Sequence, residues 1–393
     1  MDAKTDAPST PAPAEVSLVR GGPFYRVEQA VGLIRPDRWN LGRRIAALIA
    51  IGWLPLLLLT ALLNPEGLRS FLWDYRVHAR LLIAVPALLI GEIVMDARFR
   101  EVSTYIRQAA LLDAPDTAYM DSVIATLVRL RDSLLPELIV LVLLIVRIAT
   151  SYRGLVDTTP WMGQELGANY HFTVAGWYAV VVSVPIFNFL LGLAFWRWLL
   201  WTFFAFRLSR RKLKLVATHP DKHGGLGFLG LTAAAFAPIA FAITSAIAAT
   251  YRHDIELHGT HLMDYKLPAI VLVVIIVVIA LAPLLFFVPR LTALRRKGIL
   301  EYGILGQLHS MEYHEKWIRH RAGHEAEFLQ ATETNTMSGY GKTYESIGDL
   351  KPLPVDLGSL YTLAAAVAIP ALFVILTEIP FAVVLEDLMK AVR

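Results

Sequence analysis

Long apolar runs alternate with short charged segments over most of this sequence. A helix needs about 20 residues to cross the hydrocarbon core of a bilayer, and several of these runs reach or approach that length. They lie at residues 45–63, 79–95, 137–152, 174–206, 226–250, 267–288 and 360–377. The pattern therefore predicts an all-α membrane bundle of about seven transmembrane helices. The fourth run is unusually long, which indicates a strong tilt, an extension beyond the bilayer, or a break near Gly192.

The segments between and outside these runs have their own patterns. Residues 1–23 are polar and rich in Pro and Ala, so they predict a disordered tail, and residues 24–44 predict an amphipathic helix lying in the membrane interface. Residues 97–135 predict a helical hairpin, because helical periodicity is interrupted at Asp113-Ala-Pro-Asp116. Residues 290–358 begin as a helix and then become polar, which predicts a helix followed by a loop. Residues 45–96, 136–289 and 359–393 carry the first two spans, the middle four, and the last span with a tail.

The composition supports a membrane protein and excludes some chemistry. The chain is 56% hydrophobic and 18% charged, against about 25% charged in an average soluble domain. Cysteine is absent, which excludes disulfides, thiol catalysis and cysteine-ligated metals. The two longer extramembrane segments, residues 97–135 and 290–358, are too small for a nucleotide-hydrolysing domain.

The positive charges predict an orientation, because loops rich in Lys and Arg stay in the cytoplasm. With seven spans, the basic clusters near the span ends all fall on one side: Arg35, Arg38, Arg43 and Arg44; Arg98 and Arg100; Arg207, Arg210, Arg211, Lys212 and Lys214; Arg290, Arg295, Arg296 and Lys297. We therefore expect a cytoplasmic N-terminus and a C-terminus outside. Dividing the fourth run into two crossings would reverse the orientation of all later segments. The basic clusters that begin at Arg207 and Arg290 would then lie outside, which disfavours the division.

The segment "ATHPDKHGGLGFLG", residues 217–230, matches three motifs in part. Its His-Pro-Asp occurs in J-domains, but a membrane run follows where a J-domain needs its second soluble helix. Its glycine spacing resembles a dinucleotide-binding loop, but no strand precedes it. A second glycine-containing stretch, residues 338–344, lacks the first glycine of a P-loop, since Thr336 stands there, and it is interpreted as a loop.

A metal site and an anion site are the remaining interpretations of this segment. His219, Asp221 and His223 are metal-ligand types, but three ligands without a fourth are a weak signal. A turn that returns the chain into the membrane fits better, because glycines permit positive φ. Its free amides and the basic residues nearby would attract lipid phosphate. The residues of this predicted anion site are Arg210, Arg211, Lys212, Lys214, Lys222, Gly224, Gly225 and Gly227.

A few polar residues lie within the predicted spans, where such residues are rare and usually face a partner or a wet cavity. They are Arg147, Asn188, Arg197, Glu92 and Glu378. Arg197 is expected to reach the membrane surface or to pair with Glu92 at similar depth. Arg147 has no obvious partner, with Glu378 as one candidate. These residues predict either buried pairs that orient helices or a path for a solute or ion.

The sequence resembles a family of uncharacterised bacterial multipass inner-membrane proteins. The resemblance rests on His-Pro-Asp-x-x-Gly-Gly-Leu-Gly-Phe-Leu, here residues 219–229, together with residues 74–92, 175–191 and 376–390. It covers roughly residue 39 to the C-terminus. It implies a bacterial inner-membrane location and carries no known activity.

Three classes of function are compatible with these patterns. An ion channel, preferring anions, or a small-solute transporter is favoured by the polar residues in the spans. A membrane scaffold or signalling protein would use residues 97–135 and 290–358 to bind a cytoplasmic partner. A membrane enzyme is disfavoured, because neither a nucleophile nor a metal set is evident. We expect no cofactor and no nucleic acid, anionic lipids as partners, and a homo-oligomer as one possible assembly.

The charge asymmetry places Lys222 in the cytoplasm and His258 outside. Cysteines introduced at these positions, into a chain without any, report the orientation directly. In intact spheroplasts, we expect an impermeant thiol reagent to label position 258 and not position 222. The reverse labelling would invert the proposed topology.

Overall fold

The computed structural model describes residues 17–35, 38–155, 159–166, 169–319 and 332–378. Within these ranges, six helical segments are long and apolar enough to cross a membrane: Leu41–Leu63, Tyr75–Gln108, Val174–Ser209, Gly227–Leu257, Leu262–Leu285 and Leu357–Thr377. A bent pair, Ala114–Asp132 and Leu135–Thr150, meets at 44° and raises the number to seven if it forms one span. The predicted all-α membrane helix bundle is confirmed.

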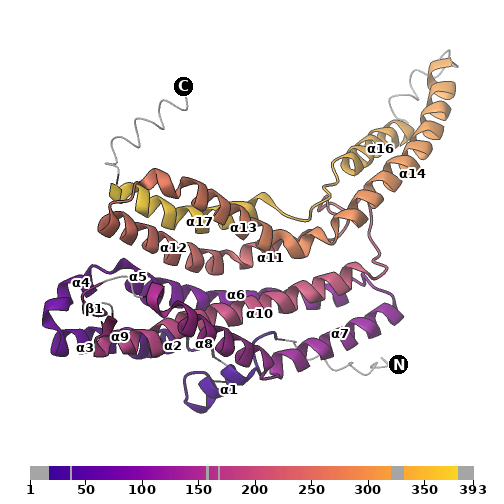
Figure 1. Ribbon diagram of the computed structural model, residues 1–393. Coiled ribbons are helices and arrows are strands. Elements are labelled where there is room, and N and C mark those ends of the chain that lie inside the picture. The colour runs from indigo at the N-terminus through magenta and orange to yellow at the C-terminus, as the bar shows by residue number, and fades with distance from the viewer. Residues whose placement is uncertain (1–16, 36–37, 156–158, 167–168, 320–331, 379–393) are drawn as a thin grey trace.

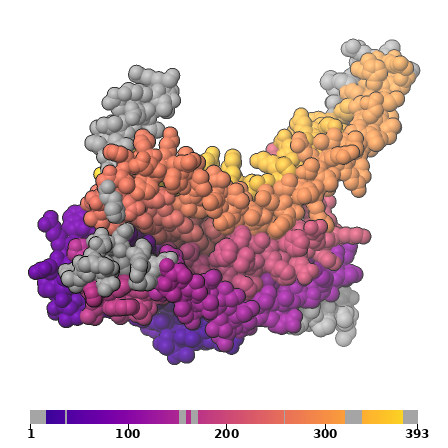
Figure 2. Space-filling view, in the orientation of Figure 1, coloured from indigo at the N-terminus to yellow at the C-terminus, as the bar shows by residue number. Residues whose placement is uncertain are grey.

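The helices form two layers and a projecting arm (Figures 1 and 2). One layer contains α1 (Pro23–Ala30), α2 (Leu41–Gly52), α3 (Leu54–Leu63), α4 (Leu68–Leu72), α5 (Tyr75–His78), α6 (Val85–Gln108), α7 (Ala114–Asp132), α8 (Leu135–Leu155), α9 (Val174–Tyr178) and α10 (Val184–Ser209). The other contains α11 (Leu231–Ala235), α12 (Ala237–His258), α13 (Lys266–Leu285) and α17 (Leu357–Glu378). Helix α12 packs on α6 and joins the layers.

The arm consists of α14 (Val288–His314) and α16 (Thr332–Gly348), which packs back along α14. The hydroxyl of Tyr340 donates a hydrogen bond to the carbonyl of Tyr302, and Gly306 gives the Tyr340 ring room to approach. Residues 338–344 therefore lie in a helix, and their interpretation as a loop was wrong. Their polar sequence is helical because α14 supplies a surface on which to pack.

Prolines within the spans are accommodated by local changes in the helix. Pro86 and Pro185 each follow a short π-helical segment, Ala79–Ala84 and Ala179–Ser183. A proline removes one helix hydrogen bond and clashes with the preceding turn, and a wider turn relieves that clash. The long helices therefore continue past both prolines.

The fourth predicted span is one continuous helical segment, Val174–Ser209. The helix does not break near Gly192; instead, this glycine lets α8 approach α10 closely. A Cβ atom at position 192 would lie 2.7 Å from the Val140 side chain. The predicted helical hairpin of residues 97–135 corresponds to the end of α6, a turn and α7. The end of α10 extends alongside α7.

The N-terminal segment differs from its prediction. Ser17 Oγ and the Leu18 amide donate hydrogen bonds of 2.5 and 2.8 Å to the Asp96 carboxylate, and Leu18 and Val19 are buried. Residues 17–22 are thus packed on the bundle, where a disordered tail was predicted, and residues 1–16 lie outside the described ranges. Helix α1 is shorter than the predicted interfacial helix. It directs Glu28 into the protein, where this residue is only 3% exposed.

Four buried charges join α1, α2, α6 and α10. Arg44 donates hydrogen bonds of 2.9 and 2.8 Å to the two carboxylate oxygens of Glu28, and a third of 3.0 Å to Glu92. Glu92 also pairs with Arg197 at 3.4 Å, which confirms the predicted pairing of these residues. Arg44 is completely buried. Two acids and two bases therefore neutralise one another inside the bundle.

Removing one member of this network should destabilise the fold strongly. Glu92→Ala leaves two arginines without their shared carboxylate, and breaking a buried pair costs about 3–5 kcal/mol. We expect a large drop in the unfolding midpoint of the detergent-purified protein. Glu101→Ala is the matched control, because Glu101 is an exposed member of an ion pair on the same helix. Such pairs contribute about 1 kcal/mol or less. Equal effects of the two substitutions would contradict a structural role for the network.

A β-hairpin that the sequence patterns did not predict follows α8. Strands β1 (Gly163–Leu166) and β2 (Asn169–Phe172) pair in antiparallel register, with Gly163 opposite Phe172. The hairpin leads into α9, and Thr173 caps that helix by accepting a hydrogen bond from the Gly176 amide. Trp161, just before the hairpin, is completely buried and helps to close one end of the bundle.

Candidate functional site

A polar cavity of about 220 Å³ lies at the end of the bundle remote from the four-charge network. Its walls come from α3, α5, the π-helical turn after α5, α8, the Trp161 segment, the π-helical segment Ala179–Ser183, the start of α10, and α12. The charged residues that line it are Asp74, Arg76, Arg80, Arg147 and Asp254. Among the described residues, the cavity thus gathers three arginines and two aspartates.

Asp74 is the best satisfied of these charges. It caps α5 by accepting a hydrogen bond of 3.1 Å from the Arg76 amide, and its other oxygen accepts one of 3.0 Å from Trp161 Nε1. Arg76 Nε lies 3.4 Å away, and His253 Nδ1 lies 3.9 Å away. These contacts hold the Asp74 carboxylate in place and pair it with Arg76.

Arg80 and Arg147 are the less compensated charges. Arg147 Nη1 donates a hydrogen bond of 3.2 Å to Asn188 Oδ1, so the structure brings these two candidates together. The side chain of the other suggested partner, Glu378, lies outside the described residues. Arg80 makes no hydrogen bond or salt bridge within the described part of the chain; the charges of Arg76 and Arg147 repel it, and the charge of Asp74 attracts it.

This arrangement is suited to holding an anion. Guanidinium groups donate several hydrogen bonds and keep their charge, so they bind carboxylates, phosphates and small inorganic anions well. Like charges repel strongly where water is scarce, and an anion between them would relieve that repulsion. Ser183 and Thr250 also line the cavity, but their hydroxyls donate to the backbone carbonyls of Gly52 and Ala246, so the arginines are the groups available to an anion.

Asp221 organises the His-Pro-Asp segment. Its carboxylate accepts hydrogen bonds from the backbone amides of His223, Gly225 and Gly227 at 2.8, 3.1 and 2.8 Å. Its Oδ1 also lies 2.8 Å from His219 Nδ1. Gly224 and Gly225 have φ values of 63° and 95°, which explains two of the glycines. The segment is a turn that returns the chain to the membrane helix beginning at Gly227, as predicted.

The predicted anion site at this turn must be corrected. The amides of Gly225 and Gly227 are occupied by Asp221 and are not free for lipid phosphate. Several basic side chains also have acidic neighbours: Arg211 lies 3.8 Å from Asp116, Lys214 2.7 Å from Asp113, and Lys222 2.7 Å from Asp349. Arg210 and Lys212 have no carboxylate within salt-bridge distance in the described ranges. A basic surface remains, but it is smaller than predicted.

The weak metal candidates do not converge on a common point. The His223 ring is buried and directs Nδ1 toward the Asp221 carbonyl at 2.6 Å. The Asp221 carboxylate is directed at the amide hydrogens of its own turn. No cluster of three or more potential ligands occurs among the described residues.

Comparisons with protein-family models, with curated proteins and with solved structures found no match.

Sequence reasoning found Arg147 and Asn188 but missed Arg76, Arg80, Asp74 and Asp254. These four lie near the ends of spans, where charged residues are common. One signal was present: Arg76 and Arg80 are four residues apart, so they share a helix face. That face follows an aspartate in a position to cap the helix.

The Asp221 turn should depend on pH. Burial alone would raise the pKa of Asp221, but the hydrogen bonds from the His223, Gly227 and Gly225 amides outweigh burial and lower the pKa below its usual range. The stabilisation is therefore complete above the unfolded-state pKa of about 4 and is lost as the pH falls through the lower folded-state value.

Hydrogen exchange measured by mass spectrometry on residues 217–230 tests whether the Asp221 carboxylate holds the turn. At neutral pH, we expect Asp221→Ala to accelerate exchange about tenfold or more, since hydrogen bonds to charged groups contribute about 1.5–3 kcal/mol. Asp349→Ala removes only the exposed ion pair to Lys222 and should leave the amides protected. Unchanged exchange in Asp221→Ala would show that the carboxylate does not hold the turn.

Proposed function

We propose that this chain is a bacterial inner-membrane protein that binds a small anion in the arginine-lined cavity and passes it across the bilayer, as an anion-preferring channel or transporter. The observation that carries the proposal is Arg80. It is a half-buried guanidinium, without a salt bridge in the described ranges, that faces a cavity shared with Arg76 and Arg147.

The energetics of the bilayer support this proposal. Arg147 lies well inside the apolar helix α8, and an arginine at the centre of a membrane helix costs about 2.5–3.5 kcal/mol on insertion scales. Arg80 lies near the end of its span, where the cost is smaller. The four-charge network compensates its own arginines with carboxylates. Among the described residues, the cavity has fewer carboxylates than arginines, so an external anion is the natural counter-charge. Cationic rings and pockets of this kind select anions in other pores.

The remaining parts of the proposal follow from the charge distribution. The arm and the Asp221 turn lie on the cytoplasmic side, and the anion cavity lies toward the outside. Anionic lipid headgroups contact the basic surface at Arg210 and Lys212. Assembly as a homo-oligomer is compatible with the exposed apolar faces of α3, α8 and α13.

Flux through liposomes tests the proposal. Purified protein should pass chloride faster than potassium, and both Arg80→Ala and Arg147→Ala should lower this preference about tenfold, which corresponds to about 1.4 kcal/mol. The control is Arg129→Ala, since Arg129 lies on α7, does not line the cavity, and donates a hydrogen bond to Thr126 of its own helix.

Binding is measured separately from flux, so that a coupled transporter is also detected. Thermal stability in detergent is recorded with chloride, phosphate and small carboxylates, for the wild type and for Arg80→Ala. We expect at least one anion to stabilise the wild type more than the variant. A folded protein that neither passes nor binds any of these anions would contradict the proposal.

A scaffold function is the second candidate, and one observation favours it. Helix α14 carries an exposed apolar stripe at helical spacing, in which Leu300, Ile304, Leu308 and Met311 are 60, 65, 56 and 59% exposed. This stripe lies on the projecting arm (Figure 1), where a partner could reach it. Large exposed apolar surfaces commonly mark interaction sites. Liposomes without flux, together with copurification of a partner that depends on Leu308, would favour this function.

A further inference from the structure

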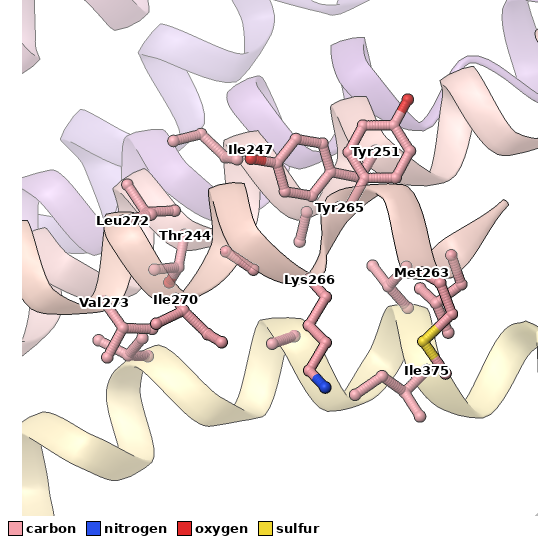
Figure 3. A pocket seen from close by; sticks show the side chains of 16 residues that line it. Thr244, Ile247, Tyr251, Met263, Tyr265, Lys266, Ile270, Leu272, Val273 and Ile375 are labelled. Atoms are coloured by element: carbon pink, nitrogen blue, oxygen red, sulfur yellow. The ribbon is translucent and has the colours of Figure 1, made fainter. Parts of the chain in front are cut away.

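A second cavity, of about 460 Å³, lies between α12, α13 and α17 (Figure 3). Its wall is formed by aliphatic side chains such as Ile247, Ile270, Val273 and Val374. The one hydroxyl at its inner end, that of Thr244, already donates to the Ala240 carbonyl at 2.9 Å. The interior therefore offers no free polar group to a ligand, and water would find no partners there.

The cavity is elongated along the helices. It extends from Lys266 to Val273 on α13, from Tyr251 to Thr244 on α12, and from Ile375 to Val367 on α17. Seven residues of helix span about 10 Å, so the cavity is roughly two helical turns deep. All three helices are apolar enough to cross the membrane, and the lining residue Ile270 is 51% exposed. The occupant is therefore drawn from the hydrocarbon phase.

The mouth of the cavity differs from its interior. Lys266, the first residue of α13, extends between α13 and α17 and places its ammonium beside the opening (Figure 3). It is exposed and forms no salt bridge in the described ranges. Tyr251 and Tyr265 stack with ring centroids 4.3 Å apart and line the same end of the cavity as Lys266. A lysine whose stem covers apolar surface while its head reaches the membrane interface is well placed to meet a phosphate.

We infer that this cavity binds one acyl chain of an anionic phospholipid, whose headgroup phosphate pairs with Lys266. An acyl chain matches the aliphatic wall, its elongated shape and its opening toward hydrocarbon. The single positive charge at the mouth selects an anionic headgroup over a zwitterionic one. The inference does not depend on the anion cavity, because no lining residue is common to the two sites.

Native mass spectrometry of the full chain, freed of lipid in detergent, tests the inference. The probes are phosphatidylglycerol and phosphatidylcholine with the same two oleoyl chains, and free oleic acid. We expect the wild type to retain one phosphatidylglycerol in preference to the other two probes. Lys266→Ala should weaken its binding about fivefold, equivalent to about 1 kcal/mol, and weaken phosphatidylcholine binding less, because the choline ammonium already compensates that phosphate.

Filling the cavity provides the matched comparison. Ala371→Phe introduces a ring from α17 into the cavity, whereas Ala368→Phe places the same ring on an exposed position of the same helix that does not line it. We expect at least a tenfold loss of phosphatidylglycerol binding in Ala371→Phe and none in Ala368→Phe. Ala269→Phe fills the cavity from α13 and replaces Ala371→Phe if that variant does not fold.

Three results would overturn the inference. The first is undiminished phosphatidylglycerol binding in a folded cavity-filling variant, since the chain would then lie elsewhere. The second is equal binding of phosphatidylglycerol and phosphatidylcholine with no effect of Lys266→Ala, which would leave an unselective contact with the bilayer. The third is retention of oleic acid but of neither phospholipid, which would assign the cavity to a free fatty acid.

Discussion

The electrostatic cost of removing an arginine from water constrains the N-terminal half of this protein. Arg44 is completely buried, so its charge must be met by carboxylates held in place by other helices. Glu28 meets it from α1 and Glu92 from α6, and Glu92 is shared with Arg197 of α10. The position of α1 follows from this requirement, because Glu28 reaches Arg44 only if α1 lies against the bundle. The docking of residues 17–20 on Asp96 continues the same surface.

The two polar clusters of the bundle differ in how far they are compensated. In the network around Arg44, two carboxylates face two guanidinium groups, so the charges of this closed cluster balance. In the cavity at the opposite end, Asp74 is held by Trp161 and Arg76, while Asp254 accepts a hydrogen bond from Tyr265 at 3.3 Å. Arg80 and Arg147 are left facing the cavity. A closed cluster orients helices, and an open one has capacity for a ligand, which is why our functional proposal rests on the second.

Patterns that are local in the sequence predicted local structure well. Span positions follow from the length of apolar runs, and the turn at residue 113 follows from a proline flanked by aspartates. The Arg197–Glu92 pair could be expected because both charges lay inside apolar runs. By contrast, Arg80 lay at a span end, where a charge is ordinary, and its proximity to Arg147 depends on how the π-helical segment Ala79–Ala84 and α8 are placed. The same holds for α16, which has little apolar periodicity of its own and is supported by α14, and for the amides that Asp221 captures through the folding of its turn.

The shared carboxylate of Glu92 has a consequence for how the protein is made. Ribosomes deliver Glu28 and Arg44 first, and these two residues can pair at once. Glu92 on α6 follows, and its second arginine, Arg197 on α10, is made much later. A lone helix with such a charge partitions poorly into lipid. The early helices are therefore expected to wait beside the insertion machinery during synthesis and to enter the lipid together once α10 has emerged.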